Sequence, residues 1–221
     1  MSAQSAAPET GATESAASDE TVTVLFIGDS VTDCGRRDDD DRHLGHGYVR
    51  LIDEAFAAGG TPVTIVNRGI SGNRVRDLKA RWQKDALDVA PILVSVLIGV
   101  NDTWRRYDEN DPTSVEEFEA DYRAILSALP SRDDVALVLI EPFLLPVTPN
   151  KASWRVDLEP KIAVVHALAE EFGAVLVPAD SYLNGLDDDP TEIAADGVHP
   201  TEYGHELLAK LWLDTIEAAS N

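Results

Sequence analysis

The sequence predicts one α/β domain in which a five-stranded parallel sheet is covered by helices on both faces. Five short apolar runs alternate with helix-length segments along the 221 residues. Polar motifs containing glycine follow several of these runs, at the points where parallel strands would end. After the first 20 residues, no internal repeat or second domain boundary is visible. We therefore expect a tail over residues 1–20, disordered because it has almost no bulky apolar side chains, and one domain over residues 21–221.

The first half of the chain contains three of the expected strands. The β-branched run 22–27 and the shorter run 63–66 are typical of buried parallel strands, and 92–98 is the most apolar run of all. Helices are expected over 48–57, where two glycines follow the apolar stripe, and over 75–87.

The second half continues the alternation. Ser114 and Glu117 form a capping box for a helix over 114–129. Strands are expected at 135–140 and 174–177, and helices at 158–172 and 201–218. Pro160 would lie in the first turn of the helix at 158–172, where proline is tolerated. The proline-containing segment 143–157 is predicted to be a loop over the sheet edge.

The charge of the chain is unusual for a soluble protein. Forty Asp and Glu residues against 18 Lys and Arg residues give a formal net charge of −22. We expect a salt-adapted, halophilic surface, because a high charge of one sign is a feature of such proteins, with an acidic mesophilic protein as the alternative. A nucleic-acid partner is not expected, since phosphates require a basic surface.

Composition also bears on the cellular compartment. Cys34 is the single cysteine, so no intrachain disulfide can form, and we expect a small, partly buried side chain there. No apolar run approaches the 18 residues of a membrane span, so no membrane partner is expected. The N-terminus lacks the basic and apolar regions of a secretory signal, which favours a cytoplasmic protein.

Four polar motifs contain the candidate chemistry: Gly28-Asp29-Ser30, Ser71-Gly72-Asn73, Gly99-Val100-Asn101-Asp102 and Asp196-Gly197-Val198-His199. The first three follow strands and therefore lie at one edge of a parallel sheet, and the fourth can fold back to that edge. Ser30 taken alone is more often a helix N-cap than a nucleophile. The joint occurrence of the four motifs favours the nucleophile.

A serine hydrolase needs a nucleophile, a base, an orienting carboxylate and donors for the oxyanion. Ser30 can be the nucleophile and can donate its own N–H. Gly72 can donate a second N–H where a side chain would block close approach, and the amide of Asn101 can be a third donor. His199 is the candidate base, and Asp196 can fix its tautomer.

The four motifs resemble those of the SGNH (GDSL-type) hydrolase superfamily, over about residues 22–217. The resemblance implies a three-layer α/β/α, flavodoxin-like (SGNH-type) fold. It also implies Ser30, Asp196 and His199 as the triad, with Gly72 and Asn101 as oxyanion donors beside the N–H of Ser30. Val31 replaces the leucine of the first motif, which is a conservative change.

The stretches 28–36, 67–73, 75–82 and 98–105 are similar to one branch, the intracellular xylan (xylo-oligosaccharide) acetylesterases. The resemblance implies removal of acetyl groups from sugar hydroxyls without metal or cofactor, by a homo-oligomer. Two departures affect the expected substrate: Ala195 precedes Asp196 where relatives have an aromatic residue, and the run Asp38 to Asp41 is acidic.

Three residues that follow Asn101 are candidates for framing the substrate. Trp104, Arg105 and Tyr107 follow Asn101 and are candidates for the acyl and sugar pocket, with simple loop packing as the alternative. Asp29 is interpreted as a structural residue that braces the turn. No role is assigned to the four other histidines, His43, His46, His166 and His205.

Three other functions remain open. A thioesterase or lysophospholipase has the same chemistry with another substrate. A non-catalytic carbohydrate-binding protein could have the same sheet without the esterase activity. A metal-dependent hydrolase could use Asp29, Asp102, Asp196 and His199, although the His-rich spacing of such sites is missing. The Asp38–Asp41 run is a further candidate for a cation.

Overall fold

The computed structural model describes residues 22–131 and 134–220, so the predicted tail lies outside the described residues. Its centre is a five-stranded sheet in the order β2-β1-β3-β4-β5, in which all neighbouring strands are parallel. The strands are β1 Val22–Gly28, β2 Val63–Asn67, β3 Leu93–Leu97, β4 Ala136–Ile140 and β5 Val175–Val177. The predicted sheet is therefore confirmed, with boundaries shifted by one or two residues.

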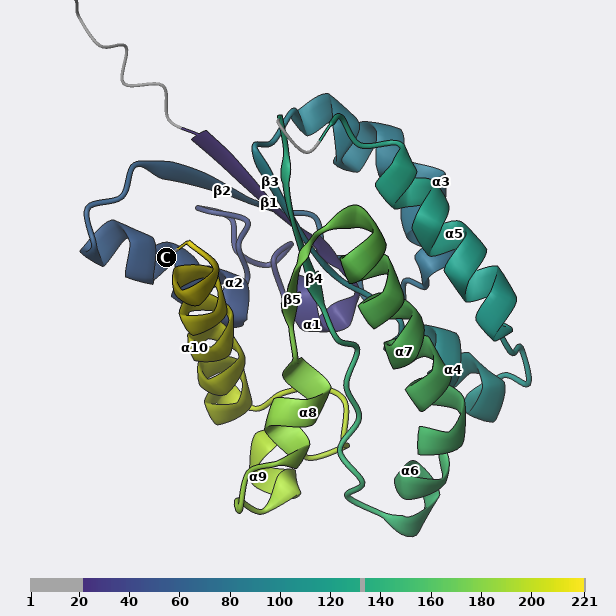
Figure 1. The fold of residues 1–221 in the computed structure, drawn as a ribbon. Helices are drawn as coiled ribbons and strands as arrows, with labels where there is room; N and C mark the ends of the chain where they lie inside the picture. The colour runs from purple at the N-terminus through teal and green to yellow at the C-terminus, as the bar shows by residue number, and fades with distance from the viewer. Residues whose placement is uncertain (1–21, 132–133, 221) are drawn as a thin grey trace, which may run out of the picture.

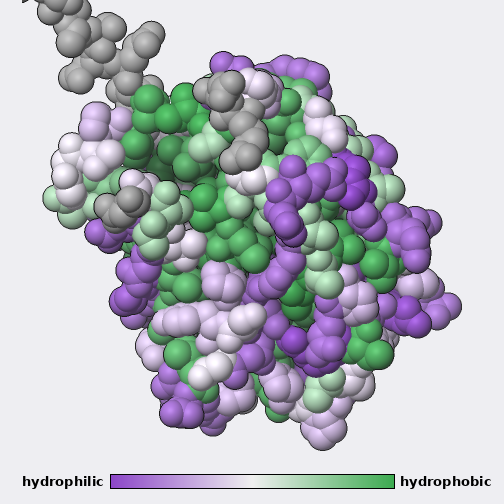
Figure 2. Space-filling model, in the orientation of Figure 1, coloured by the Kyte–Doolittle hydropathy of each residue, from purple (hydrophilic) through white to green (hydrophobic). Residues whose placement is uncertain are grey.

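Helices cover both faces of this sheet, as predicted (Figure 1). One layer is formed by α2 Tyr48–Ala58 and α10 Glu202–Ala219. The other contains α3 Val75–Asp85, α5 Val115–Ser127 and α7 Arg155–Phe172, and a short 3-10 helix η1 at Leu87–Val89 follows α3. Hydrophilic residues lie over the outer flank of α5 and α7, whereas hydrophobic residues reach the surface over the edge strand β5 (Figure 2).

Each face of the sheet has its own core because alternate residues of a strand point to opposite sides. Phe26 of β1 packs with Tyr48 and Trp212 under α2 and α10, while its neighbours Leu25 and Ile27 pack under α3, α5 and α7. All five side chains are fully buried. Burial of a side chain of this size is worth about 1.5–3 kcal/mol.

Short helices lie at the carboxyl ends of the strands (Figure 1). They are α1 Ser30–Asp33, α4 Val100–Asp108, α6 Pro149–Ser153, α8 Ala179–Asn184 and α9 Pro190–Ile193. The sequence predicted none of them. No helix in the described ranges is long and apolar enough to cross a membrane.

The segment 143–157 was wrongly predicted to be a loop throughout. Thr148 N-caps α6, its Oγ1 accepting the N–H of Lys151 at 3.1 Å, and Pro149 takes the first helical position, where its fixed φ suits a helix. Helix α7 then begins at Arg155, so Pro160 lies inside the helix and not in its first turn. Within this segment, residues 143–148 and the turn residue Trp154 lie outside helices and strands.

Candidate active site

The turn after β1 presents Ser30. Strand β1 ends at Gly28, where a Cβ would lie 2.2 Å from the carbonyl oxygen of Leu97, so no larger residue fits. Asp29 is the N-cap of α1, its Oδ1 accepting the N–H of Val31 at 3.0 Å. Burial raises the pKa of Asp29 to about 7, although this hydrogen bond opposes the shift. Ser30 is thus the first residue of α1 and not its cap, which leaves its hydroxyl free for another partner.

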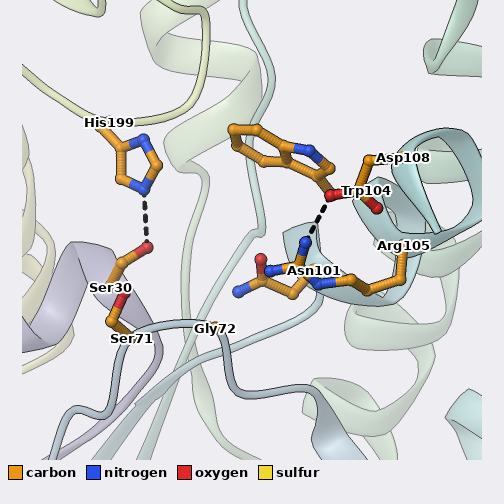
Figure 3. A pocket seen from close by; sticks show the side chains of 8 residues that line it. All are labelled: Ser30, Ser71, Gly72, Asn101, Trp104, Arg105, Asp108 and His199. Atoms are coloured by element: carbon orange, nitrogen blue, oxygen red, sulfur yellow. Dashed lines mark hydrogen bonds and ion pairs between the residues drawn. The ribbon is translucent and has the colours of Figure 1, made fainter.

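That partner is His199 (Figure 3). The Oγ of Ser30 lies 2.9 Å from Nε2 of His199, and Nδ1 of the same ring lies 2.7 Å from Oδ2 of Asp196. Oδ1 of Asp196 accepts the N–H groups of Val198 and His199 at 2.9 and 2.8 Å. A carboxylate held in this way favours the tautomer with its proton on Nδ1, so Nε2 can accept the proton of Ser30.

Electrostatics favour a charged form of this ring. The hydrogen bond to Asp196 raises the pKa of His199 above its usual value, although partial burial opposes the shift. Burial alone would raise the pKa of Asp196. Its hydrogen bonds from the His199 ring and from the two N–H groups outweigh burial and lower that pKa overall. The pair is therefore suited to hold a proton taken from a serine.

Gly72 and Asn101 lie beside Ser30, with both residues lining the same cavity. Gly72 has φ of +83°, which L side chains rarely adopt, whereas a Cβ there would meet only Arg105 Nη2 at 3.7 Å. Glycine is therefore required here by the backbone conformation. A Cβ at this position would not clash with the rest of the protein. Asn101 donates one amide hydrogen to the carbonyl of Asn73 at 3.0 Å. Within the described residues, the N–H groups of Ser30 and Gly72 have no acceptor, so both can serve a ligand.

The cavity has a volume of about 160 Å³, and the side chains that line it are drawn in Figure 3. Four of its lining residues come from one face of α4, at positions i, i+3, i+4 and i+7: Asn101, Trp104, Arg105 and Asp108. The others are Ser30, Ser71, Gly72 and His199. Ser71 and Asp108 were not predicted from the sequence as lining residues. The helical spacing after Gly99 was the signal that would have found Asp108.

Aromatic rings border the cavity on one side. The ring of Trp104 lies 5.7 Å from that of His199 and 5.5 Å from that of Trp154. Nζ of Lys151 lies 3.7 Å from the centroid of Trp104 and 3.8 Å from that of Trp154. Tyr107 does not line the cavity but stacks on Trp154 at 4.8 Å, as the packing alternative for this residue supposed.

The residues proposed for a metal-dependent site have other contacts. Oδ2 of Asp102, which is buried, accepts the N–H of Val75 at 3.1 Å. Asp39, in the acidic loop, accepts three backbone N–H groups, from Arg42, Leu44 and Gly45. Across residues 22–131 and 134–220, no three His, Cys, Asp or Glu side chains are grouped so that they could hold a metal ion.

Two of the histidines without an assigned role form hydrogen bonds within the fold. His205 is buried, its Nδ1 accepting the N–H of Tyr48 at 3.2 Å, while Nε2 lies 3.3 Å from the Sγ of the partly buried Cys34. Burial lowers the pKa of His205 to about 4, so the ring is neutral near pH 7. His166 forms a hydrogen bond with the buried carboxylate of Glu141.

Comparison with known proteins agrees with the fold and the motifs. Residues 26–207 match the GDSL-like Lipase/Acylhydrolase family. An acetylxylan esterase from Geobacillus stearothermophilus is 36% identical over 208 residues, which are 87% of this chain and 93% of that protein. The solved structure of Axe2, an acetylxylan esterase from Geobacillus stearothermophilus, has a TM-score of 0.79 at 35% identity, covering 88% of this chain and 94% of Axe2. A GDSL-like lipase from Parabacteroides merdae has a TM-score of 0.82 at 33% identity, with the same coverage.

The fold and these matches define a carboxylic ester hydrolase of the SGNH type. The chain belongs to the GDSL-like lipase/acylhydrolase family, and the resemblance of its four motifs to that family is confirmed.

Proposed function

We propose that this chain is a serine esterase that removes acetyl groups from carbohydrate hydroxyls, with acetylated xylo-oligosaccharides as its substrates. The observation that carries the proposal is the hydrogen-bonded series Ser30–His199–Asp196 at the edge of a small cavity. No metal ligand or cofactor enters the proposed mechanism.

Acylation begins when Nε2 of His199 takes the proton of Ser30. The Oγ attacks the acetyl carbonyl carbon, and Asp196 stabilises the imidazolium that forms. The oxyanion accepts hydrogen bonds from the N–H of Ser30, the N–H of Gly72 and the amide of Asn101. Loss of one such donor typically costs about 10²–10³-fold in kcat.

Release of the sugar completes the first half of the reaction. The C–O bond to the sugar breaks, its oxygen receives the proton from His199, and Ser30 is left acetylated. Water then gives a proton to His199 and attacks the acetyl carbonyl. Collapse of the second intermediate frees acetate and returns the proton to Ser30.

Variants of the Geobacillus esterase support these assignments. Those described as catalytic mutants replace one serine, one aspartate and one histidine, and the last two are three positions apart, as are Asp196 and His199. Another variant replaces a tryptophan directly before that aspartate. Ala195 occupies this position here, so we expect a difference in the contacts to the sugar.

The size of the cavity supports a short acyl group. Pockets for drug-sized ligands have volumes of about 300–1,000 Å³, whereas the cavity that Ser30 shares with the proposed oxyanion donors Gly72 and Asn101 has about 160 Å³. This favours an acetyl group over the long chains that a thioesterase or lysophospholipase accepts. Trp104 and Arg105, which line the cavity, are the proposed contacts to the substrate, and Tyr107 would act only through Trp154.

Three further properties belong to the same proposal: a single domain over residues 21–221, a homo-oligomer, and a cytoplasmic location suited to oligosaccharides taken up by the cell. Analytical ultracentrifugation and cell fractionation test the last two. The charge of −22 adds the expectation of a high salt optimum.

The deciding experiment compares acetate release from acetylated xylo-oligosaccharides with hydrolysis of p-nitrophenyl esters of increasing acyl length, at low and multimolar salt. We expect release of acetate from the sugars and a steep loss of activity beyond short acyl groups. A preference for long acyl chains would favour the lipid or thioester alternative.

A further inference from the structure

Among the described residues of this strongly acidic chain, Arg37 and Arg68 have no ion-pair partner. All but four of the Lys and Arg side chains in residues 22–131 and 134–220 have a carboxylate within 4.0 Å. The four exceptions are Arg37, Arg68, Lys84 and Lys151, and the last of these lies over two tryptophan rings. With 40 acidic residues available, two unpaired arginines side by side require an explanation.

These two arginines line one cavity, which we call the cationic hollow. It has a volume of about 440 Å³ and is lined by Arg36, Arg37, His43 and Arg68, with no acidic side chain among the described residues that line it. Arg36 donates to the carbonyl of Gly69 at 2.5 Å and has its nearest ion-pair carboxylate, on Asp33, only at 3.9 Å.

The positive charges of the hollow act on one another. Burial lowers the pKa of Arg36, and the charges of Arg37, Arg68 and Arg81 lower it further, whereas Asp33 opposes the shift. Like charges held close together are unfavourable in the absence of a counter-ion. A bound anion would relieve this repulsion.

The hollow is connected to Ser30. A second cavity, of about 320 Å³, is lined by Ser30, Asp33, Cys34, Gly35, Arg37, Asp38 and Ser71. It shares Ser30 with the catalytic cavity and Arg37 with the cationic hollow. Three cavities therefore lie in series, with Trp104 at one end, Ser30 between, and Arg68 at the other end. A ligand bound at Ser30 can extend toward the hollow past Asp38, which is exposed.

The donors in the hollow select the chemistry of the ligand. A guanidinium group offers a planar fork of N–H donors and no acceptor, which matches the two oxygens of a carboxylate. We propose that Arg37 and Arg68 bind the carboxylate of an acidic sugar, so that the preferred oligosaccharides carry a uronate residue beside the acetylated one. The sugar part of this inference rests on the proposed function, whereas binding of the carboxylate can be measured separately.

The test uses inhibition of p-nitrophenyl acetate hydrolysis at constant ionic strength. Two inhibitors are compared: neutral xylotetraose and xylotriose bearing one glucuronate branch. For the wild-type chain we expect the acidic inhibitor to bind about tenfold more tightly, the effect of one charge-assisted hydrogen-bonded contact. In the double variant Arg37→Gln/Arg68→Gln, the ratio of the two inhibition constants should fall to about one.

Two variants serve as controls. Lys84→Gln removes another unpaired cation that lines none of these cavities, and it should keep the wild-type ratio of inhibition constants. The single variant Arg37→Gln changes an exposed side chain without a hydrogen bond to the described protein, so the fold tolerates it, and the ratio should fall part of the way.

Three results would overturn the inference. The first is equal inhibition by the two oligosaccharides, or an unchanged ratio in the double variant. The second is stronger inhibition by glucose 6-phosphate than by glucuronate, which would assign the hollow to phosphate. The third is a change of oligomeric mass in the double variant with unchanged inhibition, which would make the hollow a contact between copies. Failure of the proposed function is distinguishable, because no acetate would then be released from any acetylated sugar.

Discussion

The hydroxyl oxygen of Ser30 lies 2.9 Å from Nε2 of His199, although the two residues are 169 positions apart. The contact forms because the turn after β1 and the segment between α9 and α10 meet at the carboxyl end of the sheet (Figure 1). Asp196 holds the histidine ring with one oxygen and two backbone N–H groups with the other. The three side chains are therefore aligned for transfer of the serine proton to the ring.

The pH dependence of activity should report on His199. The ring must be neutral to accept the proton of Ser30, and its pKa is raised above the usual 6.5. We therefore expect kcat/KM to fall as the pH drops through a value above 6.5. Asp196→Asn removes the group that raises this pKa, so the acid limb should move to lower pH, and kcat should fall by about 10⁴-fold.

The control for this variant is Asp188→Asn, which makes the same change of charge at a residue whose carboxylate accepts a hydrogen bond from Tyr203 and not from His199. It should leave the acid limb in place. If Asp196→Asn also leaves the limb in place, another group controls the profile and the role given to Asp196 is wrong.

Replacement of Asn101 tests the proposed third oxyanion donor. Asn101→Asp keeps the shape of the side chain but turns the donor into an acceptor, and Asn101→Ala removes it. We expect each to lower kcat by about 10²–10³-fold with a small change in KM, because the donor acts on the oxyanion and not on the ground state. A kcat within a few-fold of wild type in both variants would assign Asn101 to structure alone, through its bond to Asn73.

Lys151 should influence catalysis through charge. Its positive charge lowers the pKa of His199. Lys151→Met keeps an unbranched side chain against Trp104 and Trp154 but removes the charge, so the acid limb should move to higher pH. Loss of the cation–π contacts should also destabilise the fold, by about 0.5–2 kcal/mol.

The matched variant is Lys151→Arg, which preserves the charge and should keep the acid limb of the wild type. The position of the acid limb is measured by pH–rate profiles, and the stability of each variant is measured separately by thermal unfolding. An acid limb that stays unchanged in Lys151→Met would show that the charge of Lys151 does not reach the ring.

A buried hydrogen bond in the core provides a prediction on stability. Nε1 of the buried Trp212 donates to Oγ of Ser95 at 3.0 Å, and both residues lie in the core away from the cavity. Ser95→Ala leaves the indole N–H unsatisfied and should cost about 1–3 kcal/mol in the free energy of unfolding, with activity retained. In a Trp212→Phe background the same change should cost less, since the donor is then absent. Denaturant unfolding of the four proteins measures this coupling, and additive costs would contradict it.

The sequence allowed good predictions where burial governs the pattern. Strands β1 and β3 are β-branched apolar runs buried on both faces, and their limits were predicted within one or two residues. Helix α4 was missed because Gly99-Val100-Asn101-Asp102 looks like a polar turn. Several side chains of this helix face a cavity instead of the core, so no apolar stripe reveals it.

Within the candidate site, the four motifs predicted which residues meet, because parallel strands bring their carboxyl ends to one edge. The positions of Lys151 and Trp154 could not be predicted in this way. Lys151 lies within α6 and Trp154 lies between α6 and α7, so their contact with Trp104 depends on how these helices pack against α4. Local sequence contains no signal for that packing.

The most direct test of the account is covalent labelling of Ser30 combined with its replacement. A fluorophosphonate should add to the wild-type chain at a single peptide containing Ser30, with complete loss of p-nitrophenyl acetate hydrolysis, and intact-mass spectrometry of Ser30→Ala should show no adduct and no activity above background. Full activity in Ser30→Ala, or an adduct on another residue, would contradict the assignment of Ser30 as the nucleophile.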